Sequence, residues 1–243
     1  QKCIGKNIIS DTNHTEENNM KLATQLTGYA VLAASMMTAP MTAAVAAPSL
    51  DANEATHLTF MREEEKLARD VYLTLADMYP NAGVFQNIAE GSEQTHTNTM
   101  RDKLAQFNLP DPNPDTNNLP ASIGVFTGAD YGAYFTEKFN ALVNWGANSE
   151  LDALYAGAFI EELDMHDIIM CPTIITKLKG IPEDQCGLEY TDERPLINAY
   201  SSLLDGSESH LRSYVGQIEA IIGVGNYEAQ YLPQDTVDAI LGR

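Results

Sequence analysis

The sequence predicts an all-α fold, and three observations support that prediction. Apolar residues recur at spacings of three and four along several long segments, as they do on one face of a helix. Capping residues, prolines and short polar stretches bound those segments. No segment shows the long apolar and polar alternation that is typical of a half-buried strand. We therefore expect a helical bundle with short extra helices and one long connection.

The first two helices are expected at residues 51–78 and 84–107. Asp51 and Glu54 have the spacing of a capping box at the start of the first helix, and a proline follows its end. Residues 108–128 carry four prolines and no periodicity. They are therefore expected to form a long connection and not a tight hairpin.

Further helices are expected after this connection. A short helix is expected at residues 131–145, and Ser149 then caps a helix that runs to residue 170. A loop with two cysteines follows, and the last major helix is expected at residues 194–222. Residues 236–241 add a terminal turn.

The N-terminal segment predicts export. Residues 22–41 are apolar and uncharged, and they follow a lysine. Ala44-Val45-Ala46 is a small-x-small cleavage pattern, so residues 20–46 are interpreted as a signal peptide of a periplasmic or extracellular protein. The alternative is an uncleaved membrane anchor, because the apolar stretch is nearly long enough to span a bilayer.

Residues 1–19 are polar and precede a plausible start at Met20, so they are interpreted as an untranslated or disordered extension. Removing them with the signal peptide leaves residues 47–243, enough for one domain with a sizeable core. This segment keeps 11 lysines and arginines against 31 aspartates and glutamates, a net charge of -20. Such acidity disfavours nucleic acid as a partner and is compatible with binding metal ions.

Two cysteines remain in the expected mature domain, Cys171 and Cys186, because Cys3 lies in the extension. An even pair in an exported chain predicts a disulfide. The alternative, a thiolate metal site, lacks the close cysteine and histidine spacing that such sites require.

Glu93 and His96 are the first candidate metal-binding pair. They are three residues apart on an expected helix, so both side chains emerge on one face. The other residues of that face are apolar, namely Ala89, Met100, Leu104 and Phe107. An ionised carboxylate in such surroundings needs a partner, and a metal cation is the strongest one. The alternative is a local hydrogen bond from Glu93 and a satisfied core histidine.

Other expected helices also place acids or histidines on apolar faces. In the first helix, Glu64 and Glu65 belong to different apolar stripes, so at least one of them faces the core. In a later helix, Glu161 interrupts an apolar stripe and Asp164 follows three residues on. Near the C-terminus, His210 lies on another apolar stripe.

Four stretches of the chain resemble a ferritin-like family catalogued as a domain of unknown function, number 2202. The stretches are Glu63–Tyr72, Ser92–His96, Gly157–Asp164 and Gly206–Arg212, and the resemblance spans about residues 51–240. It implies a four-helix bundle related to ferritins and rubrerythrins, with the long connection as its crossover. It also implies a carboxylate-bridged di-iron or di-manganese centre between the helices.

The resemblance implies roles for individual residues. In that superfamily a ligand glutamate often precedes an inward tyrosine by seven residues, which selects Glu65 with Tyr72 and leaves Glu64 beside the ligands. The implied metal ligands are Glu65, Glu93, His96, Glu161, Asp164 and His210. Where the usual fourth helix repeats Glu-x-x-His, this sequence has Ser207. Either Asp164 supplies the missing oxygen, or one metal position is weak or empty.

Four other residues are interpreted outside the ligand set. His57, near the start of the first helix, is expected to be exposed, and His166 is expected to be a packed or supporting residue. Tyr72 and Tyr214 are more often core aromatics than redox groups, although Tyr72 has the position to donate to a ligand carboxylate.

The sequence is compatible with two functions of different classes. The first is an exported iron or manganese protein with an oxidase or peroxidase-like role. The second is a non-catalytic structural or binding module whose inward acids pair with Arg62, Lys66, Arg69 or Arg212. The sequence has no phosphate-binding glycine loop and no nucleophile-elbow motif that would favour other enzyme classes.

Overall fold

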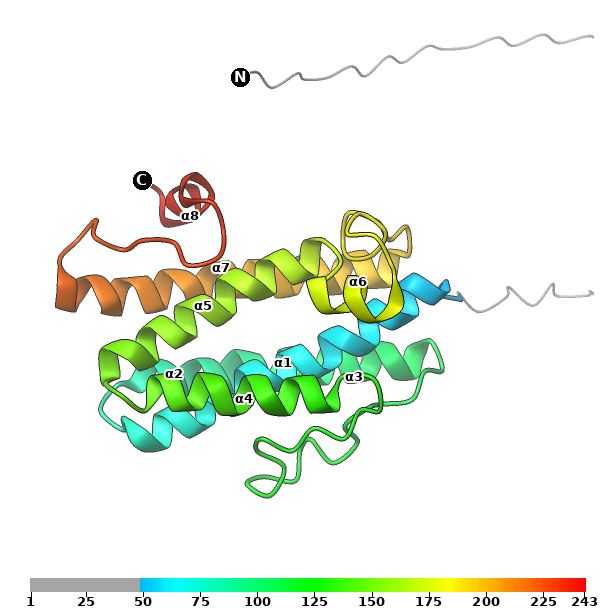
Figure 1. Cartoon of the computed structure of the whole chain (residues 1–243), viewed down its shortest axis with the longest axis horizontal. Coiled ribbons are helices and arrows are strands. Elements are labelled where there is room, and N and C mark those ends of the chain that lie inside the picture. The colour runs from blue at the N-terminus through cyan, green and yellow to red at the C-terminus, as the bar shows by residue number, and fades with distance from the viewer. Residues whose placement is uncertain (1–48) are drawn as a thin grey trace, which may run out of the picture. The chain divides into compact units, whose positions relative to one another are not determined.

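Four helices pack around one shared interior in the computed structural model, which describes residues 49–243 (Figure 1). They are α1 (Ala52–Met78), α3 (Gln94–Gln106), α5 (Glu150–Ile169) and α7 (Arg194–Ile222). Helix α1 packs against α3 and α5, and α7 packs against the same two helices. Helix α4 (Gly132–Gly146) lies against α1 and α5. The described residues contain no strand, so the all-α prediction is confirmed.

The predicted extension, residues 1–19, and the predicted signal peptide, residues 20–46, lie outside the described residues. Within residues 49–243, no helix has the length and hydrophobicity needed to cross a membrane.

Capping residues explain where the long helices begin. Asp51 Oδ1 accepts hydrogen bonds of 2.8 Å from the backbone N–H groups of Asn53 and Glu54. The Glu54 carboxylate accepts one of 2.9 Å from the Asp51 N–H, which completes the predicted capping box. At the start of α5, Ser149 Oγ accepts from the Asp152 N–H at 3.0 Å, as predicted.

The second predicted helix is interrupted by a π-helical turn. It consists of α2 (Gly83–Ile88), the π turn η1 (Ala89–Glu93) and α3. Residue spacing in the sequence does not reveal a π turn, although Gly91 lies within it and glycine weakens a regular helix. The turn ends at Glu93, whose side chain it leaves buried in the core, 2% exposed.

The long connection between α3 and α4 covers a face of α1 that carries buried cations. Arg62 donates two hydrogen bonds of 3.0 Å to the Asp111 carboxylate. Lys66 donates to the Ser122 carbonyl at 2.8 Å, and Arg69 donates to the Thr116 carbonyl at 3.0 Å. The connection therefore lacks regular structure but is tied to α1 by charged groups.

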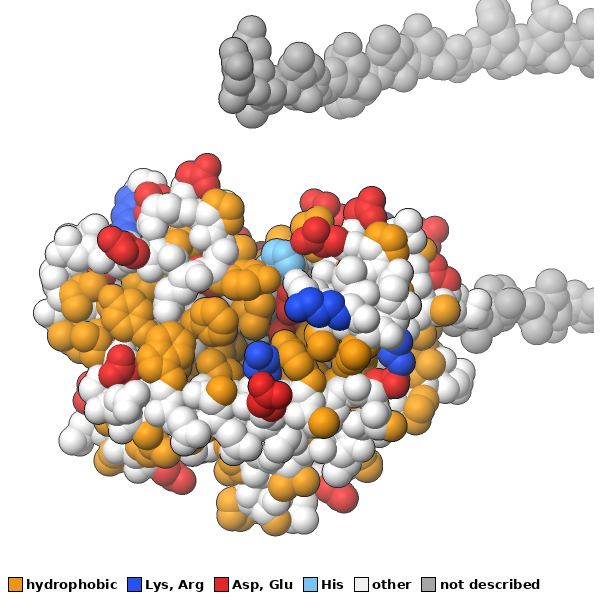
Figure 2. All heavy atoms as spheres, viewed as in Figure 1, with side chains coloured by type: hydrophobic (Ala, Val, Ile, Leu, Met, Phe, Trp, Pro, Cys, Tyr) orange, Lys and Arg blue, Asp and Glu red, His pale blue; other side chains and the backbone are white. Residues whose placement is uncertain are grey.

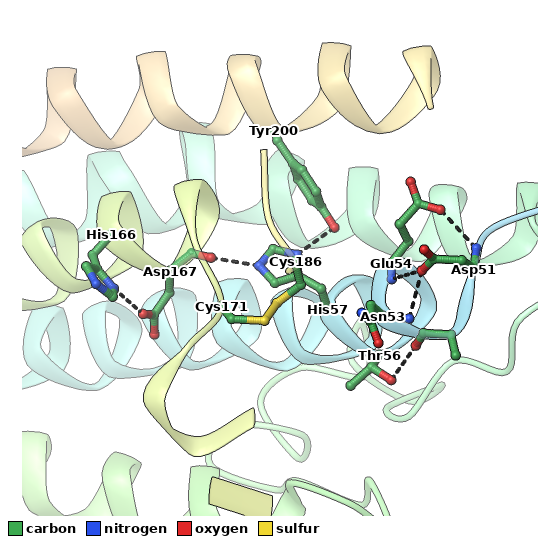
Figure 3. The surroundings of a disulfide bond; sticks show 11 residues. Asp51, Asn53, Glu54, Thr56, His57, His166, Asp167, Cys171, Cys186 and Tyr200 are labelled. Carbon is green, nitrogen blue, oxygen red and sulfur yellow. Dashed lines mark hydrogen bonds and ion pairs between the residues drawn. A yellow bond between two sulfur atoms is a disulfide. The ribbon is translucent and has the colours of Figure 1, made fainter. Parts of the chain in front are cut away.

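The segment between the two cysteines contains a helix that the sequence did not predict, α6 (Thr173–Lys179). Cys171 and Cys186 form the predicted disulfide, with their Cα atoms 4.8 Å apart (Figure 3). The bond closes a loop that joins the end of α5 to the chain leading into α7.

Replacing Cys171 and Cys186 by alanine is expected to lower the free energy of unfolding by about 3 kcal/mol, because the open loop gains conformational entropy in the unfolded chain. Urea unfolding of the oxidised protein and the double variant measures this difference. Mass analysis of the oxidised protein without reductant provides the control. Two free thiols in that sample would contradict the disulfide.

The prediction that His57 is exposed is wrong. Its side chain is fully buried, its Nδ1 accepts a hydrogen bond of 2.9 Å from the Tyr200 hydroxyl, and its Nε2 donates one of 2.7 Å to the Asp167 carbonyl (Figure 3). Burial lowers the pKa of His57 to about 4, so the ring is neutral. His57 lies near the start of a helix, but α5 and α7 cover it, which the local sequence does not show.

The C-terminal segment is held on α5 by Glu162. Its carboxylate accepts hydrogen bonds from the backbone N–H groups of Gln230, Tyr231 and Leu232 and from the Tyr227 hydroxyl, at 2.6 to 2.9 Å. Helix α8 (Gln234–Leu241) follows and begins two residues earlier than predicted. Glu162 therefore has a structural role, and the neighbouring Glu161 faces the bundle interior.

Candidate metal centre

Five of the predicted ligands meet between α1, α5, α7 and the segment from η1 to α3, where they form two overlapping triads. Glu65, Glu93 and His96 form one triad, and Glu93, Glu161 and His210 form the other. Within each triad, one ligand atom from every residue lies within 4.8 Å of the others. All of these residues are buried, and Glu93 belongs to both triads. These acidic and histidine groups have the composition and spacing to bind metal.

Glu93 directs one carboxylate oxygen toward each histidine. Its Oε2 lies 3.4 Å from Nδ1 of His96, and its Oε1 lies 2.9 Å from Nδ1 of His210. Glu65 Oε2 completes the first triad at 3.4 Å from His96 Nδ1, and Glu161 Oε2 completes the second at 3.3 Å from His210 Nδ1. Glu93 therefore contacts both histidines, each through a different carboxylate oxygen.

Neighbouring hydroxyl groups orient the triad residues. The Ser92 hydroxyl lies 3.2 Å from Nε2 of His96, which leaves Nδ1 toward the carboxylates. The Tyr72 hydroxyl donates to Glu161 Oε1 at 2.6 Å, which leaves Oε2 toward His210. Partners of this kind fix the direction of metal ligands in proteins. Tyr72 is therefore hydrogen-bonded to one carboxylate of the triads.

Asp164 lies beside the triads but belongs to neither. Ser207, at the position where the resemblance implies a glutamate, donates a hydrogen bond of 2.6 Å to Asp164 Oδ2. Oδ1 of Asp164 is buried and has no hydrogen-bond partner among the described residues. Burial and the carboxylates of Glu65 and Glu161 raise the pKa of Asp164 well above its usual value. The Ser207 hydroxyl therefore holds the Asp164 carboxyl close to position 207, where the resemblance implies the carboxyl of a glutamate.

Glu64 and His166 also lie outside both triads. Burial and the neighbouring carboxyl groups of Asp167 and Asp164 raise the pKa of Glu64 well above its usual value. His166 Nδ1 lies 2.7 Å from Asp167 Oδ1 (Figure 3). Both residues therefore belong to a neighbouring group around Asp167.

The triads place more acids than bases in a buried space. Burial raises the pKa of Glu65 to about 7. Burial would lower the pKa of His210, but the carboxylates of Glu161 and Glu93 raise it to about 10. Glu65 Oε1 and His96 Nδ1 are buried and make no hydrogen bond of normal geometry within the described residues. Unsatisfied buried ligand atoms around a shared carboxylate fit a metal cation.

In the non-catalytic module, basic residues would pair with the inward acids. In the structure these basic residues form ion pairs with other carboxylates. Arg62 pairs with Asp111, both Lys66 and Arg69 pair with Asp70, and Arg212 pairs with Glu208. Among residues 49–243, the acids of the triads form ion pairs with His96 and His210 and with no lysine or arginine.

Gly206 is a feature of the site that the residue spacing did not single out. A Cβ atom at this position of α7 would lie 2.5 Å from Cε1 and 2.7 Å from Nε2 of His96. Glycine is unfavourable inside a helix, so its presence there was a usable signal of close packing. The absence of a side chain at Gly206 leaves the space that the His96 imidazole occupies.

This chain is similar to a known domain family and to a solved structure. The model of a family described as an uncharacterized protein domain, DUF2202, matches residues 54–243. The uncharacterized protein MJ0754 of Methanocaldococcus jannaschii is 38% identical over 174 residues, which are 72% of this chain and 76% of that protein. The crystal structure of the hypothetical protein MJ0754 from Methanococcus jannaschii is similar, with a TM-score of 0.64 and 35% identity over 81% of this chain and 97% of the other.

Proposed function

The chain belongs to the DUF2202 family, and we propose that it binds two iron or manganese ions between α1, α3, α5 and α7. The observation that supports this most is Glu93, which offers one oxygen to each of two histidine-containing triads. Carboxylate oxygens and imidazole nitrogens are ligands that suit iron and manganese. Glu65 and His96 would hold one ion, and Glu161 and His210 would hold the other. Glu93 would bind to both ions.

We further propose an oxidase or peroxidase-like role for this centre. Iron or manganese held by these residues would supply one-electron redox chemistry toward oxygen or peroxide. The residues of the chain orient the ligands and exclude water, because Glu65, Glu93 and Glu161 are at most 2% exposed. Asp164 would add an oxygen ligand where Ser207 replaces the expected glutamate.

Export of the protein also remains a proposal. The Cys171–Cys186 disulfide supports it, because such bonds persist mainly in oxidising compartments. Separation of cell compartments followed by detection of the protein tests it.

Elemental analysis of the purified protein tests the metal proposal. We expect about two ions per chain, as in other di-metal helical bundles. Removal of the ions by a chelator is expected to lower the melting temperature, because an ion at a thousandfold excess over its Kd stabilises the folded state by about 4 kcal/mol. A melt that neither chelator nor added iron or manganese changes would contradict the proposal and favour the non-catalytic module.

Replacing Gly206 by alanine is expected to reduce metal binding without removing a ligand. The added methyl group would displace the His96 ring, so the triad with Glu65 should lose its ion and the content should fall to about one per chain. Gly216→Ala is the control, because Gly216 lies on the same helix and a Cβ there would meet no neighbouring element within 4 Å. Equal metal content in both variants would show that His96 does not hold an ion.

A further inference from the structure

The disulfide closes a junction at one end of the bundle, where α1, α5 and α7 come together (Figure 3). Cys171 lies just after the end of α5, and Cys186 lies just before residues 187–191, which lead toward α7. The bond between the two sulfur atoms therefore holds segment 187–191 against the end of α5.

Backbone N–H groups of segment 187–191 cap the last turn of α5. The Leu188 N–H donates to the Ile168 carbonyl at 2.8 Å. The Glu189 N–H donates to the Ile169 carbonyl at 3.1 Å. The last carbonyls of a helix have no partner within that helix, so these bonds keep the end of α5 closed. Gly187 permits the close approach, because its φ is +88° and a Cβ there would lie 2.5 Å from the Ile169 carbonyl oxygen.

The same segment also holds the start of α1. The Tyr190 hydroxyl donates to Asp51 Oδ2 at 2.6 Å, and the Thr191 hydroxyl donates to Glu54 Oε1 at 2.5 Å. The buried ring of His57 on α1 lies in the same junction and is hydrogen-bonded to both α5 and α7. One covalent bond thus secures a segment that positions the ends of three helices.

These three helices carry residues of both triads. Glu65 lies on α1, Glu161 on α5 and His210 on α7. Asp164 lies about one turn before the capped end of α5 and is hydrogen-bonded to α7. A loosened end of α5 would therefore let Asp164, and then Glu161, move away from α7.

We propose that the Cys171–Cys186 bond sets how fast the metal centre releases its ions, with slow release when the bond is closed and fast release when both cysteines are thiols. This control acts on the proposed metal centre and therefore depends on it. An ion leaves when its ligands separate, and the closed junction limits that separation. The chain would hold ions loosely in a reducing compartment and retain them in an oxidising one.

The closed bond is shielded from attack by thiols. Both cysteine side chains are only 1% exposed. Figure 2 shows acidic side chains at the surface around the loop that joins the cysteines, and this loop carries the exposed Glu183 and Asp184. Thiolate anions are the attacking species, so burial and negative charge both disfavour reduction. Prolonged treatment with dithiothreitol breaks the S–S bond, protonates both sulfurs and converts the dithiol to its cyclic disulfide, which supplies the reduced protein.

Transfer of iron or manganese from the loaded protein to excess chelator measures the release rate. Reduced protein and the double variant Cys171→Ala with Cys186→Ala are each expected to release ions about tenfold faster than oxidised protein. Hydrogen exchange of the metal-free proteins gives a second reading, with faster exchange at the Leu188 and Glu189 amides once the bond is open. Elemental analysis of the oxidised protein comes first, because a protein without metal would contradict the metal centre itself. A protein that holds metal but releases it equally fast in both redox states would overturn only the role of the bond.

Three further variants separate the junction from overall stability. Gly187→Ala keeps both cysteines but displaces the segment from α5, so it should also release ions about tenfold faster, with mass analysis showing that the disulfide is intact. Gly180→Ala is the matched control, because Gly180 lies in the same loop with φ +70° and a Cβ there would meet no neighbouring element within 4 Å. Asp70→Ala breaks buried ion pairs on another face of α1 and should release ions at the unmutated rate. Equal rates for Gly187→Ala and Gly180→Ala, or release from Asp70→Ala as fast as from the double cysteine variant, would overturn the proposal.

Discussion

Replacing Glu93 by glutamine is expected to remove metal from both halves of the proposed centre. Glu93 is the one residue that belongs to both triads, and the substitution keeps its size but removes its charge. The metal content should therefore fall from about two ions per chain to near zero. Glu65→Gln and Glu161→Gln each affect one triad, so each should leave about one ion per chain.

Elemental analysis after loading with iron or manganese measures these differences, and thermal unfolding with and without chelator provides a second reading. Glu90→Gln is the matched control, because Glu90 lies in the same π turn but is exposed. It should retain the full metal content. If Glu93→Gln keeps as much metal as Glu65→Gln, Glu93 does not bridge two ions.

The helix faces that carry the triad residues were predictable from sequence because helix geometry is local. Glu93 and His96 share a face through their spacing. The caps at Asp51 and Ser149 fix where α1 and α5 begin, the helices that carry Glu65 and Glu161. The π turn was not predictable, because it changes the hydrogen-bond ladder and not the residue pattern. The helix between the cysteines was missed for a related reason, since at Thr173–Lys179 it is too short for periodicity to show.

Contacts between distant segments account for the remaining differences. His57 is buried by Tyr200 and by the backbone of Asp167, which lie 143 and 110 residues away in sequence. The partners of Arg62 were equally hidden, because Asp111 lies in a connection without any periodic pattern. Sequence spacing identifies which face of a helix is polar, but the element that covers that face follows only from the packed fold.

Asp70 lies on the face of α1 that the long connection covers, and its removal is expected to destabilise the fold. Its fully buried carboxylate receives hydrogen bonds from Lys66 and from Arg69, the latter at 2.7 Å, and both cations are only 1% exposed. It also accepts from the Gly124 N–H at 2.9 Å, which ties the long connection to α1. Asp70→Ala would leave two buried cations without a carboxylate. We expect it to lower the free energy of unfolding by about 3 to 5 kcal/mol.

Denaturant unfolding measures this loss, and hydrogen exchange at Gly124 reports whether the connection loosens with it. Asp102→Ala is the control, since Asp102 pairs with the exposed Arg101 on the surface and should cost about 1 kcal/mol or less. A cost for Asp70→Ala no larger than this control would show that the buried pair does not stabilise the fold. Because Asp70 belongs to neither triad, folded Asp70→Ala protein should keep its metal while losing stability, which separates the ion pairs of α1 from the proposed centre.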